Sequence, residues 1–107
     1  MTNVHYATGC EVKSISTPEQ LERLQAYISS LQSGGALVLI DQGVVVNSDR
    51  TDLRAGASVF VVALIFEDGS CRKLDECLNY EDARTSAASS FLYHEADYIV
   101  DMTVTAH

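Results

Sequence analysis

The chain has 107 residues, with 15 Asp and Glu against 7 Lys and Arg, and a formal charge of −8. Hydrophobic residues make up 47% of the chain, and the mean hydropathy is +0.05. Disordered chains combine high net charge with low hydrophobicity, so this composition indicates a folded protein. Phosphate groups repel a protein of this charge, which argues against direct binding of nucleic acid.

Length and cysteine content indicate a single domain, residues 1–107, in a reducing compartment. The three cysteines, Cys10, Cys71 and Cys77, are an odd number without a dense framework, which favours free thiols. The N-terminal residues lack the basic and apolar regions of a secretory leader. The longest apolar run, residues 59–66, is far shorter than the roughly 20 residues of a membrane-spanning helix. We therefore expect a cytoplasmic protein that makes no membrane contact.

The first clear element is a helix over residues 18–33, which follows weak signs of extended structure in residues 3–15. Thr17 and Gln20 have the spacing of a capping box, with a proline between them at the first helical position. Gly34-Gly35 is a stop signal, because glycine adopts a left-handed backbone without steric cost. The apolar residues of this segment recur at steps of three and four, which places them on one face: Leu21, Leu24, Ile28 and Leu31.

A block rich in β structure follows. Asp41-Gln42-Gly43 suits a three-residue hairpin loop, with Gly43 in the left-handed position. Asp68-Gly69 suits a second, two-residue hairpin turn. These turns and a polar loop over residues 47–56 separate four predicted strands, at residues 36–40, 44–46, 58–66 and 70–74.

The last two elements are a helix and a strand. Asn79 is a good N-cap, and Glu81 and Asp82 in the first turn complement the helix dipole. This helix is expected to end near Glu95, and residues 97–105 alternate as a half-buried strand does. The order of elements predicts an α+β fold: an antiparallel sheet of about five strands with two helices packed on it.

The central strands are apolar on both faces, which is typical of strands that are covered on both sides. Two helices are enough to cover one sheet face. The second face is covered either within the chain, by residues 1–15 or by helices on opposite faces, or by another molecule. The latter alternative predicts a homodimer through an apolar sheet face.

No arrangement of residues in the sequence indicates catalysis, and we expect no metal and no cofactor. Cys71 and Cys77 are too far apart for the usual zinc spacing, and no nucleophile lies beside a base. An alternative is a small metal-dependent enzyme or ligand-binding domain that uses His94 and carboxylates of loops and strand ends. Those carboxylates are Asp41, Asp49, Asp52, Glu67 and Asp68.

Negative charge is concentrated in residues 67–101, which hold nine acidic and three basic residues. Such a surface steers a basic partner and speeds association. Arg50 and Arg54 in the polar loop are further candidates, because arginine makes bidentate contacts. The predicted partner-binding residues are Glu76, Glu81, Asp82, Glu95, Asp97, Arg50 and Arg54.

These observations favour a small, acidic, non-catalytic protein that blocks the basic surface of a nucleic-acid-handling protein. One type of protein that acts in this way is a phage inhibitor of host defence, of the anti-CRISPR kind, which would act in the host cytoplasm. An alternative of the same physics is an immunity protein or antitoxin that neutralises a nuclease toxin. In both cases the expected partner is a protein with a basic surface, and no nucleic acid is bound directly.

Overall fold

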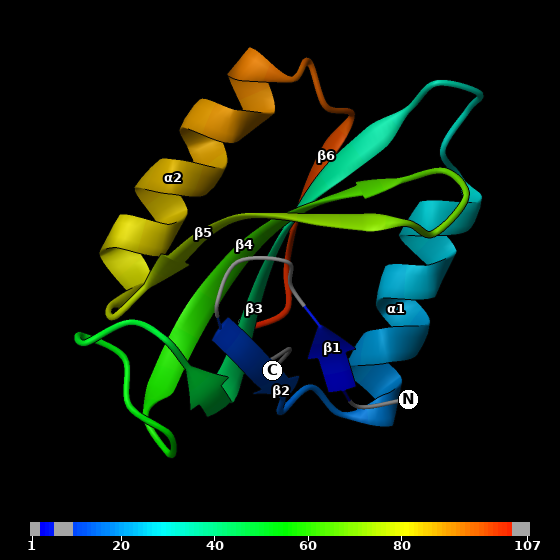
Figure 1. The fold of residues 1–107 in the computed structure, drawn as a ribbon. Coiled ribbons are helices and arrows are strands. Elements are labelled where there is room, and N and C mark those ends of the chain that lie inside the picture. Colours follow the sequence, from blue (N-terminus) through cyan, green and yellow to red (C-terminus); the bar gives the residue numbers. More distant parts are fainter. Residues whose placement is uncertain (1–2, 6–9, 104–107) are drawn as a thin grey trace.

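The computed structural model describes residues 3–5 and 10–103 and contains one mixed sheet with two helices (Figure 1). Strands β1 to β5 follow one another across the sheet in chain order, each antiparallel to the next, while β6 pairs with β3. The α+β prediction, with five antiparallel strands and two helices, is confirmed. The elements are β1 (Asn3–His5), β2 (Cys10–Ser14), α1 (Pro18–Ser29), β3 (Ala36–Ser48), β4 (Ser58–Phe66), β5 (Cys71–Cys77), α2 (Tyr80–Tyr93) and β6 (Tyr98–Asp101).

Local signals set the start of both helices as predicted. The Gln20 N–H donates to Thr17 Oγ1 at 3.2 Å, and the Thr17 N–H donates to Gln20 Oε1 at 2.7 Å, so the capping box is complete. In α2 the Asp82 N–H donates to Asn79 Oδ1 at 2.9 Å. Both helices end earlier than predicted, α1 at Ser29 instead of residue 33 and α2 at Tyr93 instead of near residue 95.

The predicted hairpin at Asp41-Gln42-Gly43 is wrong, because all three residues lie inside the continuous strand β3. Asp41 pairs with Val61 of β4, and Gly43 pairs with Val59. The segment resembles a turn because two polar residues precede a glycine. In the fold, contacts with other parts of the chain hold all three residues in a strand. The Asp41 carboxylate is buried and accepts a hydrogen bond from Ser16 Oγ at 2.7 Å. A side chain at Gly43 would overlap Val12 and Lys13 of the neighbouring strand β2.

The two helices lie on opposite faces of the sheet, which explains why the central strands are apolar on both sides (Figure 1). Alternate residues of β3 face alternate helices. Leu37 and Leu39 pack in the cluster of α1, whereas Val38 and Ile40 pack in the cluster of α2. The second face is therefore covered within the chain. The homodimer was predicted from an uncovered apolar sheet face, and the structure removes that reason for it. Oligomeric state itself stays a prediction.

A third cluster continues the α1 side of the sheet beyond the helix. Val12 of β2 and Leu53 of the loop after β3 cover Val45, Val59 and Val61 there. Leu53 is 1% exposed, so this loop, which the sequence shows only as polar, inserts one apolar side chain into the core. Burial of one leucine stabilises the fold by about 1.5–3 kcal/mol.

The pairing of β4 with β5 contains a bulge that brings two charged residues to one face. Glu76 pairs with Val61 and Lys73 pairs with Ala63, so β5 has one extra residue between them. In a regular strand, residues three apart point to opposite faces. Here Lys73 and Glu76 share the face that carries α1 and Leu53, and their side chains form an ion pair at 2.7 Å.

Strand β6 runs parallel to β3, opposite β3 residues 37–40, and both helices hold its end. The Gln20 side chain of α1 donates to the Met102 carbonyl at 2.6 Å, and the Tyr80 hydroxyl of α2 donates to the Asp101 carboxylate. The strand is shorter than the predicted 97–105, and residues 104–105 of that prediction lie outside the described residues. None of the helices in residues 3–5 and 10–103 is long and apolar enough to cross a bilayer.

Candidate functional site

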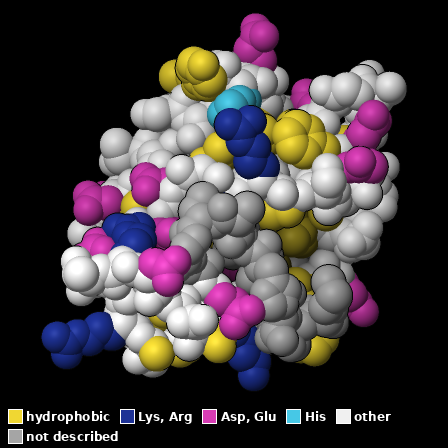
Figure 2. Space-filling view, in the orientation of Figure 1, with side chains coloured by type: hydrophobic (Ala, Val, Ile, Leu, Met, Phe, Trp, Pro, Cys, Tyr) yellow, Lys and Arg dark blue, Asp and Glu magenta, His cyan; other side chains and the backbone are white. Residues whose placement is uncertain are grey.

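The predicted partner-binding residues are spread over the structure and do not form one patch. Glu81 and Asp82 lie in the first turn of α2, while Glu95 and Asp97 follow its last turn. The rise of the helix separates these two groups by about 20 Å. On the face shown in Figure 2, acidic side chains are dispersed and basic ones lie between them. All four acidic residues are exposed.

Glu76 and Arg50 belong to an internal charge network. The Glu76 side chain is only 4% exposed and lies 2.7 Å from Lys73 Nζ and 3.3 Å from Arg50 Nη1. Arg50 also donates two hydrogen bonds to the Asp52 carboxylate, at 2.6 and 3.0 Å. These bonds raise the pKa of Arg50 and lower that of Asp52. Arg54, in the same loop, is exposed.

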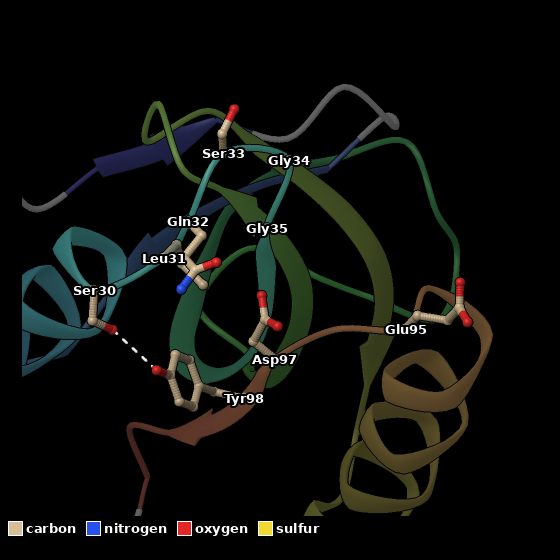
Figure 3. Close-up of a pocket in the computed structure, with 9 residues that line it drawn as sticks. All are labelled: Ser30, Leu31, Gln32, Ser33, Gly34, Gly35, Glu95, Asp97 and Tyr98. Carbon is tan, nitrogen blue, oxygen red and sulfur yellow. Dashed lines mark hydrogen bonds between the residues drawn. The ribbon is translucent and has the colours of Figure 1, made fainter.

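A polar pocket of about 500 Å³ lies where the chain leaves α1 and enters β6 (Figure 3). Both helices run toward this edge of the molecule (Figure 1). Two of the predicted residues, Glu95 and Asp97, line the pocket. Hydroxyl, amide and backbone groups from the connection between α1 and β3 line the rest, and Tyr98 lines the side of β6. The remaining lining residues are Ser30, Leu31, Gln32, Ser33, Gly34 and Gly35.

Asp97 is fixed in the pocket by the backbone at the start of β3. The Asp97 N–H donates to the Ala36 carbonyl at 2.8 Å, and the Ala36 N–H donates to Asp97 Oδ2 at 3.3 Å. The carboxylate lies directly against Gly35, where a Cβ would stand 2.8 Å from Oδ2 (Figure 3). The absence of a side chain at residue 35 therefore makes room for this carboxylate, which points toward the pocket.

Glu95 stands at the rim of the pocket in a backbone conformation that favours glycine. Its φ of 51° follows the end of α2, where the Ala96 N–H donates to the Phe91 carbonyl at 3.0 Å. This is a Schellman cap, whose left-handed residue is usually glycine. A left-handed residue with a side chain costs about 1–2 kcal/mol. In Figure 3 the Glu95 carboxylate points away from Asp97, so the pocket itself contains one fixed carboxylate.

The ends of both helices add negative potential to this edge. Neither helix has a basic residue in its last turn. The carbonyl groups at a helix C-terminus carry about half a negative charge, which cations usually compensate. None of the described residues that line the pocket is basic. Its chemistry is therefore that of a hydrogen-bond-accepting, negatively charged recess.

The described residues contain no group of three or more His, Cys, Asp and Glu side chains placed to hold a metal ion. His94 caps α2 and packs edge-on against Tyr93, with ring centroids 4.9 Å apart. The loop carboxylates proposed for an enzyme lie in separate places: Asp41 is buried beneath the start of α1, whereas Asp68 is in the turn after β4.

Burial separates the two cysteines whose side chains are described. Burial raises the pKa of both thiols, that of Cys77 to about 11, but the Cys71 side chain is exposed whereas that of Cys77 is buried. Because the thiolate is the reactive form, Cys77 should stay protonated and inert at neutral pH. We expect iodoacetamide at pH 8 to modify Cys71 at least tenfold faster than Cys77, as measured by mass spectrometry of the peptides. Equal rates would contradict the placement of Cys77 in the core.

The pocket could be found only in part from the sequence. Charge alone indicates Glu95 and Asp97, whereas the glycine pair at 34–35 indicates only the end of a helix. Gly35 has no positive φ, and its lack of a side chain is explained by the Asp97 carboxylate and the Gln32 backbone carbonyl that lie against it. Comparison of the chain with protein-family models, curated proteins and solved structures finds no match.

Proposed function

We propose that the chain is a non-catalytic binding protein that attaches through its acidic surface to the basic surface of a nucleic-acid-handling protein. The observation that carries the proposal is the excess of exposed acidic residues. Of the residues described with side chains, 11 acidic and five basic ones are exposed. One of the five, Arg50, is already paired with Asp52 and Glu76. An anti-CRISPR-type inhibitor, acting in the cytoplasm of the host, is the form of this function that we favour.

The exposed carboxylates of α2 and its ends are available to a partner. Among the described side chains, the ion pairs of Arg50 and Lys73 involve none of Glu81, Asp82, Glu95 and Asp97. Exposed charges of this kind contribute mainly to the association rate and to specificity. A basic surface that normally binds phosphate could bind these carboxylates without any chemical reaction.

Charge reversal tests this proposal. We expect the variant Glu81→Lys, Asp82→Lys, Glu95→Lys, Asp97→Lys to retain its fold by circular dichroism but to bind the partner at least 100-fold more weakly. The partner is first captured from a host lysate on the immobilised wild-type chain, and affinity is then measured on the purified pair by calorimetry at several salt concentrations. We expect the affinity of the wild-type chain to fall with salt, because surface charges are screened.

Reversal of charge elsewhere is the matched control. Glu19 and Glu22 are exposed acidic residues on α1, away from residues 67–101. The variant Glu19→Lys, Glu22→Lys should bind within about threefold of the wild-type chain if position matters more than net charge. If each variant instead lost affinity in proportion to the number of charges reversed, the binding would be only non-specific electrostatic attraction. A captured partner that DNA or RNA does not displace would contradict the occupation of a phosphate-binding surface.

A further inference from the structure

We propose that the pocket between α1 and β6 receives the guanidinium group of one arginine side chain from the partner protein. This inference rests on the proposed function and names the contact that gives it specificity. The feature that carries it is a polar cavity of about 500 Å³, lined by carboxylate, hydroxyl, amide and backbone groups and by no described basic residue. Pockets of roughly 300–1,000 Å³ accommodate whole small ligands, so a single side chain fits.

The hydrogen-bond acceptors of the pocket lie along its wall and do not converge on one point, as the ligands of a metal ion would. Asp97 Oδ2 already accepts from the Ala36 N–H, which orients the carboxylate and leaves Oδ1 for a ligand. On the neighbouring side, Ser30 Oγ lies 3.2 Å from the Tyr98 hydroxyl, and both belong to the lining. The Gln32 side chain lies near them in Figure 3. A ligand in this pocket therefore meets one carboxylate together with neutral oxygen atoms.

A guanidinium group matches this arrangement better than a metal ion or an ammonium group. A divalent ion prefers several carboxylates close together, and the described residues contain no such group. Guanidinium presents five N–H donors in a plane, whereas ammonium is a compact point charge. One donor can bind Asp97 Oδ1 while the others bind the neutral oxygen atoms. The planar group can also stack on the ring of Tyr98, which Tyr27 holds at a centroid distance of 5.2 Å.

Electrostatics at the pocket favour a cation before any specific contact forms. The C-terminus of α1 supplies the residues from Ser30 onward, and α2 ends just before Glu95. Neither last turn contains a basic residue, so no side chain of the last turns compensates the helix dipoles. A partner arginine would supply the missing charge. The carboxylates at the start of α2, Glu81 and Asp82, take no part in this contact.

The test uses small probes with the full chain, so it does not depend on knowing the partner. We would titrate N-acetyl-arginine methylamide into the labelled protein and follow backbone amide shifts by NMR. We expect saturable shifts at Gln32, Gly34, Gly35 and Glu95. N-acetyl-lysine methylamide should bind at least fivefold more weakly, and the citrulline analogue, which has the same shape without the charge, should produce no saturable shift.

Asp97→Asn removes the charge and keeps an oxygen acceptor for the Ala36 N–H. We expect it to weaken arginine binding about tenfold, the loss of one charge-assisted hydrogen bond. Glu22→Gln on the exposed face of α1 makes the same change of charge elsewhere and should leave binding unchanged. Tyr98→Phe should weaken binding less than Asp97→Asn, because the ring remains.

Several results would overturn the inference. They are equal binding of arginine and lysine, shifts spread over the whole surface, or unchanged binding in Asp97→Asn. Any of these would leave the proposed function intact if the charge-reversed variant still loses the protein partner. Failure of the proposed function would give a different result: the four charge reversals would not weaken binding of the protein partner.

Discussion

Gly43→Ala should lower the free energy of unfolding by about 3 kcal/mol, the upper part of the usual range for overpacking a core. A Cβ at residue 43 would stand 2.6 Å from the Lys13 backbone carbonyl oxygen and would overlap Val12 Cγ1. Two strands pair at this point, since Gly43 is opposite Ser14 in β2 and opposite Val59 in β4. Neither strand can move away without breaking its pairing. Urea unfolding followed by circular dichroism measures the loss.

A second glycine provides the control for this substitution. Gly56 has a φ of 90°, and nothing lies within 4 Å of a Cβ placed there. Gly56→Ala should therefore cost only the backbone penalty of about 1–2 kcal/mol. Adding Val12→Ala to Gly43→Ala should recover part of the stability but not all of it, because the Lys13 carbonyl belongs to the backbone. A smaller loss at Gly43 than at Gly56 would contradict the close approach of β2.

Glu76→Met should cost about 3 kcal/mol, because a buried ion pair loses one of its two charges. The side chains of Lys73 and Glu76 are each 4% exposed, and Glu76 Oε2 accepts no hydrogen bond. Lys73→Met should cost less, since Arg50 Nη1 still lies 3.3 Å from Glu76 Oε1. The double variant Lys73→Met, Glu76→Met should be more stable than Glu76→Met alone, because no buried charge remains.

The exposed half of the same network is the control. Asp52 is 52% exposed and bonded to Arg50, so Asp52→Ala should cost less than about 1 kcal/mol, as exposed ion pairs do. A double-mutant cycle in urea gives the coupling between Lys73 and Glu76 directly. A coupling below about 0.5 kcal/mol would show that the two charges act independently and would contradict the buried pair.

The features predicted from the sequence are those whose cause is local. The start of α1 follows from Thr17, Pro18 and Gln20, which lie within four residues of one another and form the capping box by themselves. The turn at Asp68-Gly69 is equally local, with Gly69 at a φ of 84°. The spacing of the apolar residues in α1 likewise identified the face of this helix that packs on the sheet.

The features that escaped prediction depend on residues far apart in the chain. Gly43 looks like a turn residue, and only the approach of β2 from residues 12–13 explains it. Glu76 looks like one more surface acid until the bulge in β5 places it beside Lys73. The pocket combines residues 30–35 with residues 95–98, which meet only because β6 pairs with β3. No local pattern contains these pairings, so the sequence indicated Asp97 by its charge and not by its surroundings.

The parallel pairing of β6 with β3 also constrains when the protein can fold. It joins Leu37 to Tyr98, and β6 and the residue after it bring Val100 and Met102 to the cluster beneath α1. During synthesis α1, β3 and β4 exist for some time before these residues, so the apolar stripe of α1 lacks part of its cover. Contacts between residues so distant in sequence slow folding, and exposed apolar surface in the interval favours aggregation. Completion of the core therefore waits for residues 98–102, and the pocket between α1 and β6, which depends on the same pairing, cannot form before them.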